Sequence, residues 1–269
     1  MNPPAASPLL LRLFARYSRG YLARHFHAVR LSRGGAVPAA AVGGPLVVYC
    51  NHPSWWDPLV GLLLALELWP GRRHFAPIEA AQLERYRFFA RLGFFGVEPG
   101  TVAGARAFLR TAEAILDRPD AALWITPQGR FGDPRERPPR LEAGLAHLAR
   151  RGRGRFLPLA LEYPFWDERL PEALASFGEP LDAAEVAARP AAEITAVLAA
   201  RLAETQDRLA AEARSRDRLA FDLLLAGRAG VGGVYDRFRA AAARLRGEGF
   251  RREHGEPDGS PAPPVARCR

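Results

Sequence analysis

The sequence contains no lysine, only two cysteines and no long apolar run. Its 38 basic residues are therefore all arginine, and with 29 acidic residues they give a net charge of +9. Cys50 and Cys268 are too few and too far apart for a disulfide framework or a cysteine-based metal site, which favours a reducing compartment. The longest apolar run, Leu59 to Leu66, is far shorter than the ~20 residues of a spanning helix. The sequence thus predicts no transmembrane helix, no metal site and no bound cofactor.

The excess of positive charge suits nucleic acid or an anionic membrane equally well. No nucleic-acid-binding motif is present, so nucleic acid is not an expected partner. The N-terminal segment also lacks the continuous apolar region of a secretory signal, because arginines interrupt it. A peripheral position on the cytoplasmic face of the cell membrane is therefore the expectation.

An amphipathic helix is predicted over residues 1–33. Successive rotations of about 100° place Leu10, Phe14, Tyr17 and Tyr21 on one side of this helix. The arginines lie on the opposite side. A helix of this kind lies in a lipid interface or docks on its own domain, and both readings stay open. The arginines concerned are Arg12, Arg16 and Arg19.

The remainder reads as a single α/β domain over residues 34–255, because 269 residues with 48% apolar side chains can bury one substantial core. A tail over residues 256–269, rich in Pro, Gly and Ser, is predicted to be disordered. Strands alternating with helices predict a mostly parallel sheet with helices on both faces, followed by a helical C-terminal part from residue 183. The expected strands cover residues 46–50, 94–97, 121–125 and 156–162, and the expected helices 59–68, 79–91, 102–116, 141–150 and 234–246.

The sharpest local motif runs from Asn51 to Asp57, directly after a predicted buried strand. Open parallel sheets place their sites at such strand ends. His52 is followed five positions later by Asp57, at the start of a helix, so the chain can turn and bring the carboxylate onto one imidazole nitrogen. Such a pair is a general-base device. Alone the spacing is weak, since Asp57 also fits a helix cap and His52 an ordinary polar group.

Further motifs make the pattern specific. Residues 51–57 resemble the Asn-His-x4-Asp block of the glycerolipid/lysophospholipid acyltransferase superfamily, of the 1-acylglycerol-3-phosphate O-acyltransferase type. The second, third and fourth blocks of that family are partly matched, in the family's order, by Phe94–Val97, Thr126–Arg130 and Leu157–Leu159.

The resemblance implies transfer of a fatty acyl group from acyl-CoA or acyl-carrier protein to a hydroxyl of a lysophospholipid or other lipid. His52 is then the general base, Asp57 its partner, and a backbone N–H near Gly129 the expected oxyanion donor. The expected substrate-binding residues are Asn51, Ser54, Gln128, Gly129 and Arg130.

Three departures from the family pattern put the acceptor in question. Val97 and Glu98 stand where phosphate-using members carry an arginine, and a glutamate repels a phosphate. Gln128 replaces the acidic residue of the third block, and its arginine is displaced to Arg130. A lipid without a phosphomonoester is therefore an expected acceptor. Two other functions stay open: an acyl-thioester hydrolase that uses the same pair, and a non-catalytic basic protein that binds membranes.

Two further sets of residues have a functional and a structural interpretation. Cys50 lies two positions before His52 and could supply a nucleophilic thiol, but a small buried strand residue is the expectation. His25 and His27 could ligate a metal, but no third ligand has suitable spacing. They are predicted to be polar positions on the first helix.

Overall fold

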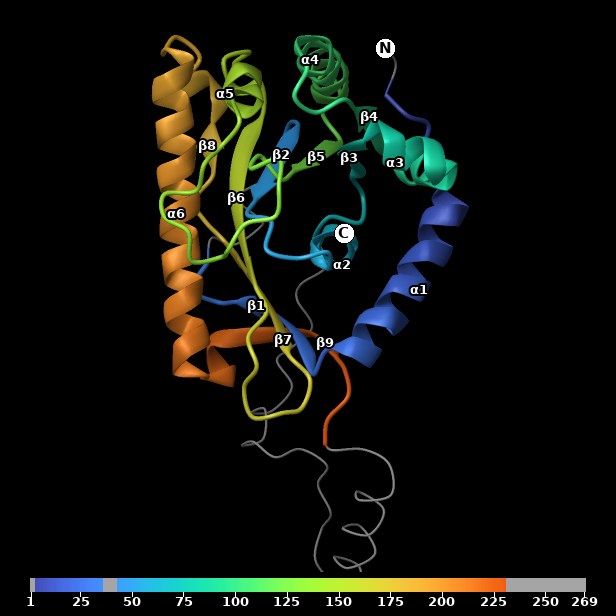
Figure 1. Ribbon diagram of the computed structural model, residues 1–269, viewed down its shortest axis with the longest axis vertical. Coiled ribbons are helices and arrows are strands. Elements are labelled where there is room, and N and C mark those ends of the chain that lie inside the picture. Colours follow the sequence, from blue (N-terminus) through green and yellow to red (C-terminus); the bar gives the residue numbers. More distant parts are fainter. Residues whose placement is uncertain (1–2, 36–42, 231–269) are drawn as a thin grey trace, which may run out of the picture.

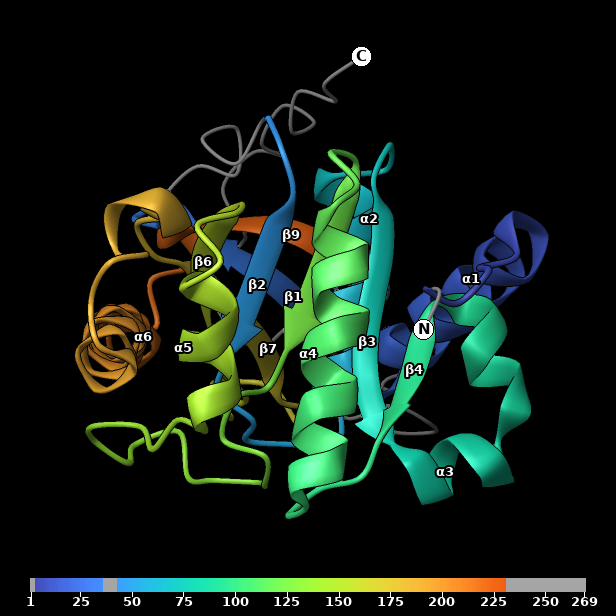
Figure 2. The ribbon, with the colours of Figure 1, turned by 90° about the horizontal axis from the view of Figure 1, so that it is seen from above.

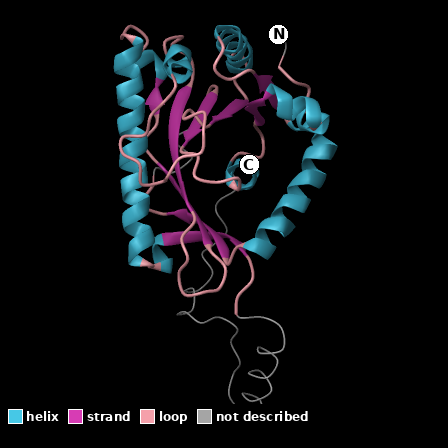
Figure 3. Cartoon of the chain, viewed as in Figure 1, coloured by secondary structure: helices cyan, strands magenta, loops and turns pink. Residues whose placement is uncertain are grey.

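A computed structural model describes residues 3–35 and 43–230 of the chain (Figure 1). These residues form one mixed sheet with nine strands in the order β4-β3-β5-β2-β6-β7-β1-β9, with β8 paired to β6. Helices flank the sheet on both faces, so the predicted α/β class is confirmed (Figure 3). The helix predicted over 234–246 and the tail over 256–269 lie outside the described residues.

One half of the sheet is entirely parallel. Because these five strands run in the same direction, their carboxyl ends all lie at the same edge of the sheet. Four of the five strands were predicted, and the missed one contains Pro77 and charged ends, which hide its extended pattern. The strands are β2 (Leu46–Cys50), β3 (Arg73–Glu79), β4 (Phe94–Val97), β5 (Ala121–Ile125) and β6 (Arg155–Glu162).

The other half of the sheet corrects two predictions. Helix α1 (Pro8–His25) stops well before residue 33, and β1 (Ala28–Ser32) follows it into the sheet. The C-terminal part is likewise not wholly helical, because β9 (Phe221–Ala226) pairs with β1 in antiparallel orientation. Strand β7 (Glu172–Phe177) lies parallel to β1 and antiparallel to β6. A short β8 (Leu181–Asp182) completes the set.

Helices cover both faces of the sheet (Figure 2), and the two larger of the three apolar clusters lie on opposite faces. On β2, Val47 and Tyr49 face one cluster while Val48 and Cys50 face the other, so the strand is buried on both sides. Helix α2 (Asp57–Leu68) packs with α1 on the second face. The first face carries α4 (Val102–Leu116), α5 (Ala143–Ala149) and α6 (Ala191–Ser215).

The helix predicted over 79–91 is divided at Tyr86 into α3 (Ala80–Arg85) and a 3-10 turn, η2 (Arg87–Leu92). Gly93 then turns the chain into β4 with φ of 102°, and a Cβ there would lie 2.3 Å from the His74 carbonyl oxygen. Only glycine fits both conditions. No helix within the described ranges is long and apolar enough to cross a membrane. Two more 3-10 turns are η3 (Ala183–Glu185) and η4 (Arg218–Ala220).

Candidate active site

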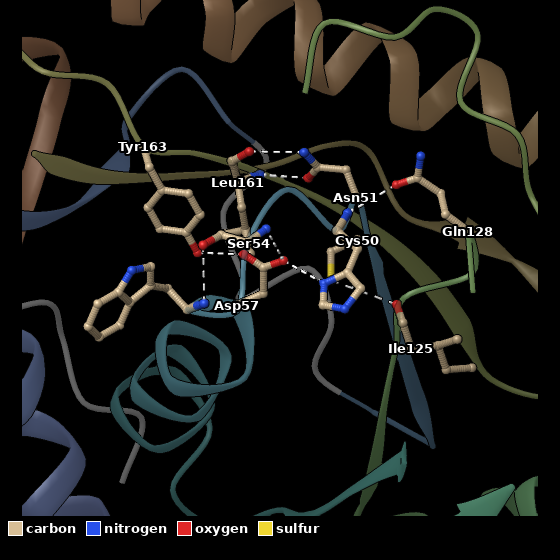
Figure 4. A network of polar contacts seen from close by, with 10 residues as sticks. Cys50, Asn51, Ser54, Asp57, Ile125, Gln128, Leu161 and Tyr163 are labelled. Atoms are coloured by element: carbon tan, nitrogen blue, oxygen red, sulfur yellow. Dashed lines mark hydrogen bonds and ion pairs between the residues drawn. The ribbon is translucent and has the colours of Figure 1, made fainter. Parts of the chain in front are cut away.

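The loop after β2 brings His52 and Asp57 together at the carboxyl edge of the parallel strands. Asp57 is the first residue of α2, where the helix dipole favours a negative charge. Its Oδ2 lies 2.6 Å from His52 Nδ1 and also accepts a hydrogen bond of 3.1 Å from the Ser54 backbone N–H (Figure 4). The five-residue separation closes as the sequence predicted, and the Ser54 contact fixes the turn.

The two partners differ in their access to solvent. The side chain of Asp57 is 2% exposed, while that of His52 is 18% exposed. With Nδ1 directed at the carboxylate, the imidazole tautomer that donates to Asp57 leaves Nε2 as a proton acceptor. The arrangement is therefore a buried carboxylate behind a histidine that is partly open to solvent.

Tyr163 is a third member that the sequence did not point to. It follows β6 directly, and its hydroxyl donates a 2.6 Å hydrogen bond to Oδ1 of Asp57. Burial is the main cause that raises the pKa of Tyr163 well above 10, with the neighbouring Asp57 carboxylate second. The hydroxyl therefore stays protonated and stays a donor. Tyr163 could have been found only from the pairing of β6 with β2, and the sequence alone does not show that pairing.

Asn51 is buried and joins the ends of the same two strands. Its side-chain Nδ2 donates to the Leu161 carbonyl at 2.9 Å, and its Oδ1 accepts from the Leu161 N–H at 2.8 Å. Both polar atoms of the Asn51 amide are thus bonded to the Leu161 backbone. These bonds fix the end of β2 against β6, and with it the start of the loop that carries His52. A substrate contact for Asn51 and for the Ser54 hydroxyl, which accepts from the Trp56 N–H at 3.3 Å, stays a prediction.

The loop that follows β5 holds His52 from the opposite side. The buried side chain of Gln128 accepts a hydrogen bond from the His52 N–H at 3.0 Å, and the Gly132 N–H donates to the His52 carbonyl at 3.0 Å. Phe131 lies between Gln128 and Gly132 in the sequence, and the centroid of its ring is 4.3 Å from the centroid of the His52 imidazole. The Phe131 side chain is nevertheless largely exposed. Gln128 therefore positions the histidine backbone, a role that the motif did not reveal, and Phe131 is a wall of the site that it also missed.

Gly129 and Arg130 occupy the rest of this turn. Gly129 has a φ of 64°, which favours glycine, and its N–H donates to the Thr126 carbonyl at 3.1 Å. That N–H is used by the turn, so an oxyanion donor near Gly129 has to be another group. The side chain of Arg130 is 57% exposed and pairs with Glu136 at 3.4 Å. It is accessible to an anionic group, and its substrate contact stays a prediction.

The second block lies on the outermost parallel strand. β4 is separated from β2 by β3 and β5, which puts Glu98 about 14 Å to the side of the histidine, at about 4.8 Å per strand. Parallel pairing nevertheless places Val97 and Glu98 at the edge of the sheet that carries His52. The acidic residue therefore faces the same side of the molecule as the site.

Cys50 and the two N-terminal histidines take structural positions. The Cys50 thiol is buried, lies 3.8 Å from the Ile125 carbonyl, and has its pKa raised far above the ordinary range, chiefly by burial. It is not a thiolate nucleophile. His25 lies at the end of α1 as predicted, but His27 lies beyond it and pairs with Glu172. Among the described residues, no three His, Cys, Asp or Glu side chains are grouped to hold a metal ion.

No protein-family model matches the sequence, and no curated protein matches it significantly. The resemblance to the acyltransferases therefore rests on the motif residues of the sequence.

Proposed function

We propose that the protein is an O-acyltransferase that moves a fatty acyl group from acyl-CoA or acyl-carrier protein to a lipid hydroxyl. One observation carries the proposal: the buried Asp57 carboxylate lies 2.6 Å from Nδ1 of a partly exposed His52, at the carboxyl edge of parallel strands. The neighbouring Cys50 thiol is buried and stays protonated, so it does not act as a nucleophile beside this base.

The reaction that fits this arrangement is direct attack by the acceptor. His52 Nε2 takes the proton of the acceptor hydroxyl while its oxygen bonds to the thioester carbonyl carbon. Asp57 stabilises the imidazolium that results. When the carbon–sulfur bond breaks, the imidazolium gives that proton to the leaving thiolate. The products are an ester and a free thiol.

The acceptor we propose is a neutral, zwitterionic or glycosylated hydroxyl lipid rather than a phosphomonoester. Glu98 brings negative charge to the edge that carries His52, where phosphate-using relatives of the motif place an arginine. A phosphomonoester carries up to two negative charges near neutral pH, so one that reaches the end of β4 meets a carboxylate there. Arg130, exposed on the neighbouring loop, is the group that could reverse this preference.

The test is an acceptor panel with labelled acyl-CoA and acyl-carrier protein as donors. We expect a new labelled ester, and slower consumption of lysophosphatidic acid than of lipids without a phosphomonoester. Label released only as free fatty acid would instead identify a thioester hydrolase, and no turnover with any donor would favour a non-catalytic membrane-binding protein. If lysophosphatidic acid is consumed fastest and Arg130→Ala raises its KM, the acceptor proposal is wrong.

The same proposal places the protein at an anionic membrane surface. Helix α1 docks on the domain through Ser18 and Leu22, yet leaves Leu9, Leu13 and Tyr17 exposed. Its aromatic residues continue to the catalytic loop, since Tyr21 contacts both Trp55 and Trp56, and Trp55 is itself exposed. An apolar surface beside arginines suits the lipid–water interface, and this one continues onto the loop that carries His52.

Vesicle flotation tests this placement. Changing Leu9, Leu13 and Tyr17 together to serine should weaken binding to vesicles that contain phosphatidylglycerol, and raised salt should weaken it further. Point substitutions are needed because deleting residues 1–30 would also remove most of β1 from the sheet. Leu219→Ser, an exposed leucine on η4, is the matched control. Flotation that neither salt nor the triple substitution changes would make α1 purely structural.

A further inference from the structure

The Asp57 carboxylate receives more hydrogen bonds than the histidine alone supplies. Oδ2 accepts from His52 Nδ1 and from the Ser54 N–H, while Oδ1 accepts from the Tyr163 hydroxyl at 2.6 Å. The carboxylate is almost fully buried, so these donors replace the water that a charged group requires. Tyr163 is the only one of these three donors that lies outside the loop after β2, because it directly follows β6.

Packing holds the Tyr163 ring in place. It lies 5.6 Å from the ring of Phe26, which in turn lies 4.9 Å from Trp56 on the catalytic loop. The hydroxyl has one available role towards Asp57, because an ionised carboxylate can only accept. The Tyr163 hydroxyl is therefore a fixed donor to the Asp57 oxygen that does not face His52.

We propose that Tyr163 is a positioning residue of the active site, whose hydroxyl orients Asp57 and moderates the basicity of His52. The inference rests on the proposed function of the His52–Asp57 pair. A hydrogen bond to Oδ1 draws negative charge away from Oδ2, the oxygen that faces the imidazole. The imidazolium is then stabilised less, and His52 gives up its proton at a lower pH than it would beside an unshared carboxylate.

Tyr163→Phe removes the hydroxyl and keeps the ring. The acid limb of the pH profile of kcat/KM, which reports the free base form of His52, should move upward by about 0.5–1 pH unit. The loss of orientation should lower kcat at the pH optimum by about tenfold, and KM for the acyl donor should change little. In an Asp57→Asn background the same change should have a much smaller effect, because the negative charge that the hydroxyl acts on is gone.

Tyr49→Phe is the matched control. Tyr49 is a second buried tyrosine whose hydroxyl donates to a backbone carbonyl, that of Leu198 at 3.3 Å, on the opposite face of the sheet. The variant loses one buried hydroxyl in the same way, but it should leave the acid limb unmoved. A general loss of stability would affect both variants, whereas a shift confined to Tyr163→Phe identifies the contact with Asp57.

A titration of the His52 imidazole by NMR with labelled histidine, assigned through His52→Ala, separates the two proposals. If no acyl transfer is found but the His52 titration moves upward in Tyr163→Phe, the proposed function fails and the role of Tyr163 stands. If acyl transfer is found and neither the titration nor the acid limb moves, Tyr163 is only a packing residue. A downward shift overturns the inference as well.

Discussion

Two histidine–carboxylate pairs with nearly the same geometry lie in this molecule. His52 and Asp57 are 2.6 Å apart, and His27 and Glu172 are 2.5 Å apart. The second pair is sealed, with side chains only 6% and 1% exposed, and Glu172 also accepts from Arg30 Nε at 2.9 Å.

Position in the sheet accounts for the difference. The first pair stands at the carboxyl edge of parallel strands, whereas the second joins β7 to the segment that leads into β1. The two pairs therefore cannot be told apart by the distance between histidine and carboxylate. They differ in the exposure of the histidine to solvent.

The largest effect we expect is on turnover. His52→Ala should lower acyl transfer by about 10³-fold while the protein stays folded, because it removes the base. His27→Gln, its counterpart in the sealed pair, should retain turnover per folded molecule. Steady-state rates corrected for the folded fraction by circular dichroism measure both. Near-normal turnover by folded His52→Ala would show that the two pairs are equally structural.

The second effect is on stability. Glu172→Gln leaves the buried Arg30 beside a neutral amide, and breaking a buried ion pair in this way costs about 3–5 kcal/mol. At 2–4 °C per kcal/mol for a domain of this size, Tm should fall by about 10 °C. Thermal unfolding measures it. The control Glu67→Gln, in the exposed pair with Arg19, should change stability by less than about 1 kcal/mol. An unchanged Tm with lost turnover would make Glu172 a site residue.

The smallest effect we expect is on the pH dependence of stability, and it comes from His74, a partly buried histidine that bonds no carboxylate among the described residues. His74 Nδ1 accepts from Trp124 Nε1 at 3.2 Å, and its Nε2 donates to the Trp69 carbonyl at 3.0 Å. Burial lowers its pKa to about 4, with the nearby charge of Arg72 a smaller cause in the same direction. The unfolded chain thus binds a proton at a higher pH than the folded protein does.

This contribution to stability is therefore complete above about pH 6.5 and is lost as the pH falls towards 4, up to about 3 kcal/mol. Urea unfolding across this range measures it. His74→Gln, which can still donate and accept, should flatten the dependence on pH. If the free energy of unfolding of His74→Gln depends on pH as in the original protein, the dependence comes from other groups.

The sequence predicts a pair more readily when its two partners are close together along the chain. His52 and Asp57 are five residues apart, so a loop motif and a helix start were enough. Arg30 and Glu172 are 142 residues apart, and a charge in the middle of β1 opposes a strand prediction until its partner is known. The same reason hid Tyr163, which meets Asp57 only because β6 neighbours β2.

The alternation of strands and helices predicted four of the five strands in the parallel half of the sheet, because helices follow β2, β4 and β5 along the chain. The mixed half escaped prediction. β1 directly follows an amphipathic helix, and β9 follows the Ala-rich α6. Local pattern favoured helix at both places, and pairing across the sheet decided otherwise.

The position of β1 also sets an order of events during synthesis. Its hydrogen-bonding partners are residues 172–175 on one side and residues 221–226 on the other. The N-terminal strand and the helix before it therefore leave the ribosome long before the chain that can receive them. Contacts of such sequence separation form late and slowly. Arg30 and Glu172 are 142 residues apart, so the buried ion pair on β1 forms only after most of the described chain has been made.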